Sequence, residues 1–258
     1  MYNAHQYLIK RQQLGTQSDN KYGIWKFSRK KKKSLLNSIL YRIFVRLPFD
    51  NSRKFKFFSE MSWLFRRMAF EHAHIDKPDI DYTPYKVRDN FITAYLESDN
   101  KVVDLGCGTA EYSRIAAPHV SSVIAVDYDK NILEVAKTLT NDKNVSFLSD
   151  EVFSWLSKTD DDYDVVLCAH IIEHLDDPVM FLSDCKKFFK SIYIEVPDND
   201  QDEHSFIREI HGLDPIYNDA DHIWEFKRND LHKIFSDLDF QIIEEQYIHG
   251  VMRFWLRC

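Results

Sequence analysis

The fold is decided by the stretch Val102-Val103-Asp104-Leu105-Gly106-Cys107-Gly108-Thr109-Ala110. A buried-strand run with an acidic residue near its end leads into two glycines, in the turn that opens the next helix. Glycines in such a turn let the backbone pass close to a ligand and present amide groups at a helix N-terminus. A dinucleotide-binding loop would place a third glycine at position 111, where this chain has Glu111. The loop therefore favours a ligand that carries an ammonium group and no phosphate.

Outward from this stretch, strand patterns alternate with helix patterns, which is typical of an α/β fold whose parallel sheet is covered on both faces. We expect strands near 101–105, 122–126, 145–149, 163–168 and 190–196, with helices near 110–117, 130–139, 151–157 and 178–188. After a polar segment, the pattern predicts a further helix and two strands, at 228–238, 240–248 and 251–257.

Acidic residues stand at or near the carboxyl ends of the first three expected strands. Asp127 closes the second strand, 23 residues after Asp104 (127 − 104), and Asp150 follows the third. A carboxylate at the tip of the second strand of such a sheet is placed to hold ribose hydroxyls. Each acid alone is more often a helix N-cap. Their recurrence at successive strand ends favours a ligand site.

These residues resemble the motifs of class I S-adenosylmethionine-dependent methyltransferases, over roughly 101–258 and most strongly over 101–198. The glycine loop resembles the family's first motif, and the runs 164–175 and 192–197 resemble its fourth-strand and fifth-strand motifs. Ala110 stands where a third glycine is frequent, a departure expected to bend the loop little. The resemblance implies a Rossmann-like sheet of seven strands, mostly parallel, that ends in an antiparallel hairpin.

The resemblance also implies the cofactor, S-adenosylmethionine, and the residues that bind it. Asp127 matches the ribose-binding acid of the family, and Asp150 matches the acid that contacts the adenine amino group. The expected cofactor-binding residues are Asp104, Gly106, Cys107, Gly108, Asp127, Tyr128, Asp150, Glu151 and Ala169.

Methyl transfer from a sulfonium needs an aligned nucleophile and a group that takes its proton. Candidates for that group follow the fourth strand within one helical turn, and further histidines lie in the polar segment 198–226, at the same end of the sheet. A single histidine is more often structural, so the prediction depends on their clustering. The predicted catalytic residues are His170, the first choice for the general base, with His174, His222 and Glu173.

A second interpretation assigns Glu173, His174 and His222 to a divalent ion that polarises paired hydroxyls. Glu173-His174 together with the run 221–226, Asp-His-Ile-Trp-Glu-Phe, resembles the metal-dependent small-RNA 2′-O-methyltransferases. Those enzymes have a glutamate where this chain has His170, and the Glu-His-Leu motif also occurs in metal-free relatives. A site without metal is therefore the expectation.

The sequence around the fourth strand narrows the acceptor atom. It reads Cys168-Ala169-His170-Ile171, so the Asn/Asp-Pro-Pro-Tyr motif of amino-methylating nucleic-acid enzymes is absent, as is a Pro-Cys nucleophile for pyrimidine carbon. We expect an O-methyltransferase that acts on a hydroxyl of a sugar, a glycolipid or a small molecule. The alternatives are a metal-dependent RNA 2′-O-methyltransferase and a non-catalytic cofactor-binding protein.

Charge is divided unevenly along the chain. Residues 1–70 hold 16 Lys and Arg against 3 Asp and Glu, whereas residues 71–258 hold 18 against 38. This asymmetry predicts a basic flexible arm at 1–33, a helical cap at 34–98 and the methyltransferase domain at 99–258. An acidic catalytic body is a poor match for a long polyanion, so nucleic acid is not an expected partner.

Apolar residues recur at helical spacing over 34–47, beside a basic stripe that includes Arg42 and Arg46. This helix is expected either to pack on the catalytic domain or to make peripheral contact with the inner membrane surface. The sequence offers neither a long apolar run nor a secretory signal, so a cytoplasmic protein is expected. The oligomeric state is left open.

Overall fold

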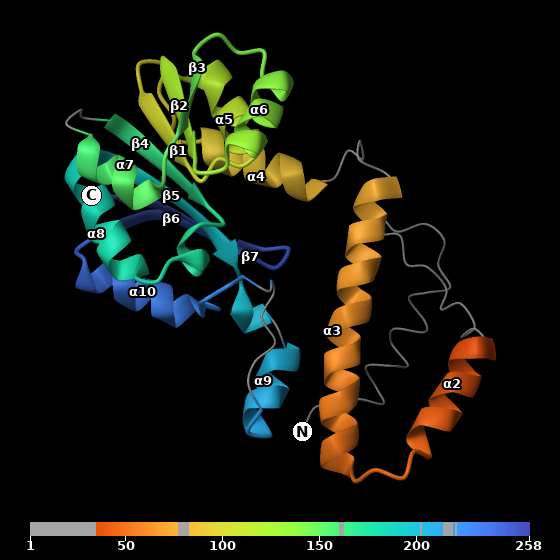
Figure 1. The fold of residues 1–258 in the computed structure, drawn as a ribbon. Helices are drawn as coiled ribbons and strands as arrows, with labels where there is room; N and C mark the ends of the chain where they lie inside the picture. The colour runs from red at the N-terminus through yellow and green to blue at the C-terminus, as the bar shows by residue number, and fades with distance from the viewer. Residues whose placement is uncertain (1–34, 77–82, 160–162, 202, 214–218, 220) are drawn as a thin grey trace, which may run out of the picture. The chain divides into compact units, whose positions relative to one another are not determined.

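In the computed structural model, the described residues are 35–76, 83–159, 163–201, 203–213, 219 and 221–258 (Figure 1). The chain divides into two compact units, here called unit 1, up to Phe55, and unit 2, from Lys56 to Cys258. The predicted basic arm, 1–33, lies outside the described residues. The described helices include none that is both long enough and apolar enough to cross a bilayer.

Unit 1 contains helix α2, Leu35–Val45, and the start of helix α3, Asn51–Asp76, which continues into unit 2. The predicted helix over 34–47 is thus confirmed, and it ends before Pro48, which cannot continue a helix. The Lys54 ammonium donates to the carbonyl of Val45 at 3.0 Å, and Asp50 accepts the Arg53 N–H at 2.8 Å. These bonds satisfy backbone groups that the two helix ends leave open.

Unit 2 is built on one seven-stranded sheet in the order β3-β2-β1-β4-β5-β7-β6. Every pairing is parallel except those of β7, which runs antiparallel to both β5 and β6. The predicted Rossmann-like sheet with an antiparallel last hairpin is confirmed. Its strands are β1 Lys101–Leu105, β2 Ser122–Asp127, β3 Val145–Ser149, β4 Tyr163–Ala169, β5 Phe189–Pro197, β6 Gln241–Ile248 and β7 Val251–Arg257.

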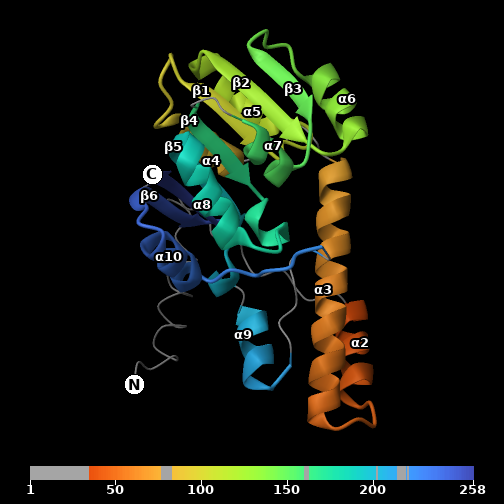
Figure 2. The same cartoon turned by 60° about the vertical axis from the view of Figure 1, so that its left-hand side comes forward.

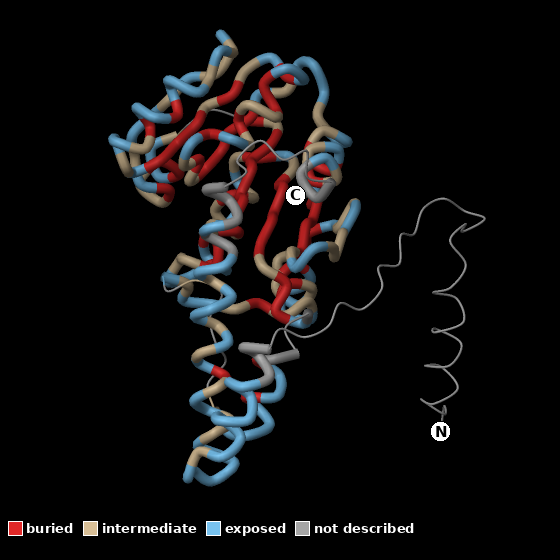
Figure 3. The backbone as a smooth tube through the Cα atoms, turned by 90° about the vertical axis from the view of Figure 1, so that its right-hand side faces the viewer, coloured by how far each residue is buried: buried red, intermediate tan, exposed pale blue. Residues whose placement is uncertain are grey.

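Helices cover both faces of this sheet. On one face lie α4 Thr83–Thr93, α5 Glu111–Ala116 and α6 Lys130–Leu139, and on the other lie α7 Val152–Lys158, α8 Pro178–Phe188 and α10 Arg228–Asp237. Figure 2 shows β3 with α6 at one end of the sheet and β6 with α10 at the other. The buried residues run through the central strands (Figure 3), because a parallel sheet covered on both faces exposes neither.

Short helices connect the main elements. These are the 3₁₀ turns η1 Ala117–His119, η2 Ile172–His174 and η3 Asn199–Gln201, and the α-helix α9 Glu203–Ile210. Helix α9 was not predicted, since the segment 198–226 was expected to be polar and irregular. All four cysteines, Cys107, Cys168, Cys185 and Cys258, are free thiols.

Candidate active site

The glycine loop joins β1 to α5 and is fixed by the end of β2. The backbone N–H of Cys107 donates to the carbonyl of Val126 at 2.9 Å, and the N–H of Gly108 donates to Oδ2 of Asp127 at 2.8 Å. Gly106 and Gly108 have φ values of 63° and 51°, in the left-handed region that glycine adopts without strain. The loop therefore holds one shape that depends on both glycines and on Asp127.

Gly106 and Gly108 have different surroundings. A β-carbon at Gly106 would overlap the side chain of Ile171, so the loop after β4 packs directly on the glycine loop. A β-carbon at Gly108 would meet no heavy atom within 4 Å. The backbone at Gly106 is thus closed by the protein, whereas the space at Gly108 is open to a ligand.

Ala110 ends the loop in a conformation that the sequence did not anticipate. It has φ 59° and is the N-cap of α5. The left-handed conformation costs a residue with a β-carbon about 1–2 kcal/mol, a cost that glycine at this position would not have.

Asp104 lies inside β1 and faces α5. It is 2% exposed and accepts a hydrogen bond from the hydroxyl of Ser113 at 2.6 Å. Burial raises the pKa of this carboxyl, the bond from Ser113 lowers it, and the balance leaves the pKa at about 7. The Asp104 carboxyl therefore changes charge close to neutral pH.

The other acids expected at the cofactor site already have partners of their own. Asp127 is buried and accepts one backbone N–H on each oxygen, from Gly108 and Asp129. Asp150 pairs with Lys158 at 2.8 Å, which holds the pKa of Asp150 below its ordinary value. Glu151 caps α7 by accepting the N–H groups of Phe153 and Ser154. Carboxylates keep further acceptor sites after such bonds, so ligand contacts at these residues stay predictions.

The two remaining cofactor-site predictions flank these acids. Tyr128 follows β2 and is 78% exposed, so its ring is accessible to a ligand. Ala169 ends β4 and is buried beside the loop that carries the candidate catalytic residues.

His170 is held between two carboxylates. Its Nδ1 lies 3.2 Å from Oε1 of Glu173, and its Nε2 lies 3.3 Å from Oε1 of Glu195. The backbone of His170 is left-handed, with φ 54°, and its N–H donates to the carbonyl of Glu195 at 2.8 Å. Both ring nitrogens thus face acceptors, an arrangement that suits an imidazolium.

Glu195 is the centre of this network. Its carboxylate accepts hydrogen bonds from the Tyr112 hydroxyl at 2.9 Å, the Tyr193 hydroxyl at 2.5 Å and the Arg253 guanidinium at 2.6 Å. Burial alone would raise the pKa of Glu195, but the bond and charge of His170 and the charge of Arg253 outweigh it and lower the pKa to about 2. The Glu195 carboxyl is therefore ionised at every pH well above 2.

The same contacts decide the protonation of His170. Burial lowers the pKa of this imidazole, but hydrogen bonds and charges from Glu173 and Glu195 dominate and raise it to about 10. A histidine that is already protonated at neutral pH cannot accept a proton from an acceptor hydroxyl. The predicted role of His170 as general base is thus disfavoured by its surroundings, and a positioning role fits them better.

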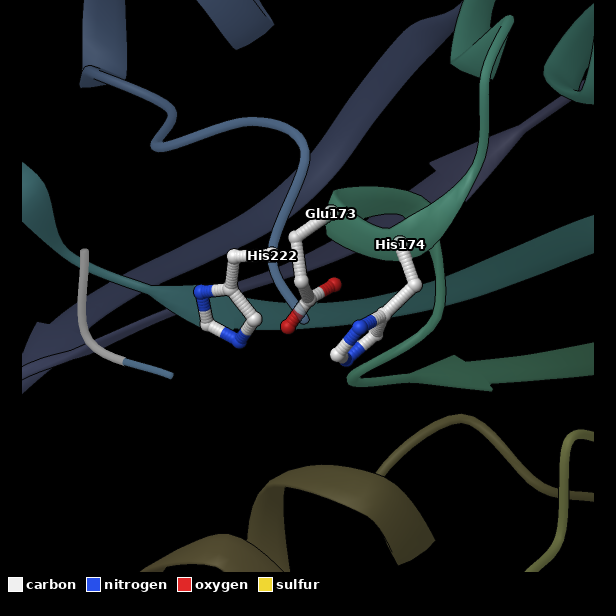
Figure 4. Close-up of side chains that lie close together, drawn as sticks. All are labelled: Glu173, His174 and His222. Atoms are coloured by element: carbon white, nitrogen blue, oxygen red, sulfur yellow. The ribbon is translucent and has the colours of Figure 1, made fainter. Parts of the chain in front are cut away.

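Glu173, His174 and His222 come together at the end of β4 (Figure 4). One donor atom from each lies within 4.8 Å of the others, and the two imidazole rings meet edge to face with centroids 4.8 Å apart. Glu173 is 1% exposed, and its Oε2 has no hydrogen-bond partner among the described residues. An unpaired buried carboxylate oxygen is costly, and a ligand or an ion bound at this position would satisfy it.

The segment 221–226 brings His222 to this place by pairing with the loop after β4. The N–H groups of Ile223 and Trp224 donate to the carbonyl of Glu173 at 2.8 and 3.1 Å, and the indole of Trp224 donates to the carbonyl of Leu175 at 2.9 Å. His222 also pairs through Nδ1 with Oε1 of Glu225 at 2.9 Å. The predicted convergence of these two segments is therefore present, whereas His211, at the end of α9, is not part of the described cluster.

The network around Glu195 was not predicted from the sequence. Glu195 was noted only as part of the fifth-strand motif, and Arg253, Tyr112 and Glu225 were given no role. An isolated acid in the apolar strand β5 and an isolated base in the apolar strand β7 were the available signs, and these two residues are register partners. Their pairing could be seen only once the order of the last two strands was known.

A family model for a methyltransferase domain matches residues 81–245, which is more than half of the chain. Among curated proteins, a ubiquinone biosynthesis O-methyltransferase of Saccharophagus degradans is 30% identical over 117 residues, which covers 44% of this chain and 49% of the relative. The chain thus spans about half the length of the curated relatives it matches.

Two solved structures share the fold. A SAM-dependent methyltransferase from Archaeoglobus fulgidus has a TM-score of 0.51 at 18% identity, covering 68% of this chain and 94% of that one. The protein in the DhpI–SAM–HEP complex has a TM-score of 0.55 at 17% identity, covering 78% of this chain and 96% of that one. At such identities the similarity concerns the fold, and it agrees with the sheet described above.

Proposed function

We propose that this chain, which belongs to the methyltransferase domain family and has S-adenosylmethionine as its cofactor, methylates a hydroxyl of a sugar, a glycolipid or another small molecule. The observation that carries the proposal is the cluster of Glu173, His174 and His222. Glu173 and His174 belong to the loop after β4, whose Ile171 packs on Gly106 of the glycine loop. Oxygen as the acceptor atom is supported by the curated relatives, which are named O-methyltransferases.

The glycine loop fits this cofactor. The space at Gly108 is open, and the carboxyls of Asp104 and Asp127 lie buried beside the loop. Two buried acids favour a ligand with positive charge and disfavour a phosphate. We assign the ammonium end of the cofactor to the open glycine loop and the ribose hydroxyls to Asp127, whose oxygens keep acceptor capacity after their backbone bonds.

His174 and His222 are suited to take the proton of the acceptor hydroxyl. Nδ1 of His174 lies 3.2 Å from the carbonyl of Asp221, and Nδ1 of His222 lies 2.9 Å from Glu225. In the tautomer that donates from Nδ1 to this acceptor, Nε2 of each ring carries a lone pair that can take a proton. Of the four predicted catalytic residues, these two replace His170 as our candidates for the general base.

Bound S-adenosylmethionine supplies a methyl group on a sulfonium, whose thioether leaves without acid catalysis. The protein must therefore align the acceptor oxygen and remove its proton. In this proposal, His222 or His174 accepts the proton and Glu173 orients the hydroxyl through its unpaired Oε2. His170, held by Glu195, fixes Glu173 in place.

A divalent ion at the same cluster is a second candidate, and a specific observation favours it. The three donors within 4.8 Å are one carboxylate and two imidazoles, and each imidazole has an acceptor at Nδ1 that would orient it toward an ion. Glu173, His174 and His222 would hold the ion, which would polarise neighbouring hydroxyls of the acceptor. The expected metal-free site and this metal site use the same residues, and they differ in whether a chelator abolishes activity.

The test is release of S-adenosylhomocysteine with four acceptor classes: a phenol of the kind found in quinone precursors, a glycolipid, a free sugar and an oligoribonucleotide. We expect turnover with one of the first three and an O-methyl product by mass spectrometry. Turnover confined to the oligoribonucleotide would support the RNA alternative, and an N-methyl or C-methyl product would refute oxygen as the acceptor atom. No turnover with any class, together with tight cofactor binding, would favour the non-catalytic alternative.

Variants of the cluster then distinguish base from metal. The base is whichever of His222 and His174 lowers the rate on substitution by Asn, because loss of a general base typically lowers the rate ~100- to 10,000-fold. His119→Asn is the matched control, since His119 is exposed in η1. If a chelator abolishes wild-type activity and a divalent ion restores it, the metal mechanism holds. If the chelator has no effect on activity, the mechanism with a histidine as general base holds.

A further inference from the structure

The apolar side chains of unit 1 are exposed. Ile39, Leu40, Ile43 and Val45 of α2 are between 38% and 53% exposed, and Phe49 is 48% exposed. Among the described side chains of this unit, those of 39–55, none is buried. An isolated helix of 11 residues is marginal in water, so α2 depends on an apolar surface to be stable.

The same segment is strongly basic. Between positions 29 and 54 there are nine Lys and Arg and a single acid, Asp50, a net charge of +8 (9 − 1). Arg42 lies in the last turn of α2, and Arg46 follows the helix in a turn where its N–H donates to the carbonyl of Ile43 at 3.1 Å. Ile39 stands three residues before Arg42, and Ile43 stands three residues before Arg46. The two arginines therefore border the apolar face.

We propose that α2 docks on an anionic lipid bilayer, lying in the interface with Ile39, Leu40 and Ile43 in the acyl region and Arg42 and Arg46 at the phosphates. Arginine suits this position, because its long stem buries beside apolar side chains while its guanidinium stays at the polar level. The basic run at 29–33 adds attraction to the same surface. No described helix could span the bilayer, so the contact is peripheral.

Other occupants fit this surface less well. Nucleic acid would use the arginines but would leave the exposed isoleucines in water. A second copy of the segment would bring together two regions of charge +8, which repel each other. Of these three occupants, an anionic bilayer alone uses both properties of α2 at once.

The inference does not rest on the proposed function, because docking needs neither cofactor nor acceptor. Its test is co-sedimentation of the full chain with vesicles of phosphatidylcholine, alone or mixed with phosphatidylserine. We expect binding to the mixed vesicles at low salt, release at high salt and little binding to phosphatidylcholine alone. Replacing two arginines, Arg42→Gln with Arg46→Gln, should lower partitioning about 30-fold, a factor of about five for each charge.

Two matched controls separate docking from general effects of charge and hydrophobicity. Lys130→Gln with Lys143→Gln removes two exposed charges from unit 2 and should leave vesicle binding unchanged. Ile39→Asp with Ile43→Asp should abolish binding, whereas Val135→Asp, at a 48% exposed position of α6, should not. Unchanged melting temperature of unit 2 would confirm that every variant folds.

Three results would overturn the proposal. If the arginine and isoleucine variants bound vesicles as tightly as the wild type does, α2 would not be the docking element. Salt-sensitive binding to an oligoribonucleotide without binding to vesicles would assign the surface to nucleic acid. A dimer that Ile39→Asp with Ile43→Asp converts to monomer, again without vesicle binding, would assign it to a second copy.

Discussion

Glu195 holds His170 at two points: its carbonyl accepts the His170 N–H at 2.8 Å, and its Oε1 lies 3.3 Å from Nε2 of the His170 ring. The first contact supports a left-handed backbone at His170, and the second fixes the ring. Because Glu173 and His174 follow directly in the chain, the pair determines where the candidate catalytic cluster lies. The residue predicted from sequence as the base has its pKa raised to about 10 by Glu173 and Glu195, which suits a positioning role.

The first prediction concerns the stability of this pair. The pKa of His170 rises from 6.5 to about 10 on folding, so its contribution to the free energy of unfolding is complete below about pH 6.5 and is lost as pH rises through 10. The pKa of Glu195 falls from 4.5 to about 2, so its contribution is present above 4.5 and lost as pH falls through 2. His170→Gln should therefore destabilise most between pH 4.5 and 6.5, with a penalty that shrinks toward pH 10.

Urea unfolding at pH 6, 8 and 10 measures this penalty. His119→Gln, at an exposed position, is the control and should show no comparable dependence on pH. A penalty for His170→Gln that is the same at all three pH values would show that the ion pairs contribute nothing to stability.

The second prediction concerns Asp127. Asp127→Ala removes the assigned ribose contact, and it also frees the Gly108 N–H that now donates to this carboxylate. Loss of a charge-assisted pair costs about 2–3 kcal/mol, so the affinity for S-adenosylhomocysteine should fall roughly 30- to 150-fold. Isothermal calorimetry measures the affinity directly, and Asp129→Ala, which removes only the N-cap of α6, is the control. Unchanged affinity in Asp127→Ala would refute the assignment.

The third prediction concerns the contact between Gly106 and Ile171. Gly106→Ala adds a β-carbon that overlaps Ile171 and also strains a left-handed backbone, which alone costs about 1–2 kcal/mol. Gly250→Ala suffers only the backbone strain, because its β-carbon would meet no heavy atom within 4 Å. Gly106→Ala should therefore lower the free energy of unfolding more than Gly250→Ala does, by thermal or urea denaturation.

A double variant isolates the steric part of that effect. Ile171→Ala in the Gly106→Ala background should recover part of the lost stability, although Ile171→Ala alone should destabilise. If the two substitutions were simply additive, the two loops would not be in contact in solution.

The fourth prediction concerns the pH dependence of cofactor binding. Asp104 has a pKa of about 7 in the free protein, and a cationic ligand at the glycine loop favours its ionised form. Binding should therefore release a proton below pH 7, and affinity should rise with pH by up to about tenfold per unit until the carboxyl is ionised. Calorimetry from pH 5.5 to 7.5, in buffers of different ionisation enthalpy, measures both effects.

Asp104→Asn is the informative variant, since an amide keeps the shape but cannot titrate. Its affinity should be nearly flat over the same range. A pH dependence equal to that of the wild type would place the titrating group elsewhere.

Most of the sheet could be predicted from sequence, because its strands are short apolar runs that end at glycines and acids. The bounds of β1, β3, β7, α6 and α8 were predicted to the residue, and the remaining strand bounds to within one residue. Helix α9 was not predicted, since its eight residues mix polar side chains with Phe206, Ile207 and Ile210, which are all exposed. The helix is also shorter than the window of about 11–18 residues over which helical periodicity is usually detected.

The candidate site was predictable in its members but not in their roles. Glu173, His174 and His222 were grouped correctly, because the ends of parallel strands meet at one edge of the sheet. The protonation of His170 depends on Glu195, which is 25 residues away (195 − 170) on the neighbouring strand, and on a left-handed backbone. Neither is encoded by local pattern, so the raised pKa of His170 could not be foreseen from the sequence.

The position of β7 has a consequence for biosynthesis. This strand lies between β5 and β6, so β5 keeps an unpaired edge until the ribosome has made the residues that follow β6. A nascent chain at that stage already has β1, β2 and the glycine loop, but it lacks Arg253 to neutralise Glu195. The glycine loop and the strands beside it can therefore assemble during translation, whereas the network around Glu195 is complete only after β7 has inserted. Until then, the edge of β5 is open to pairing with other strands.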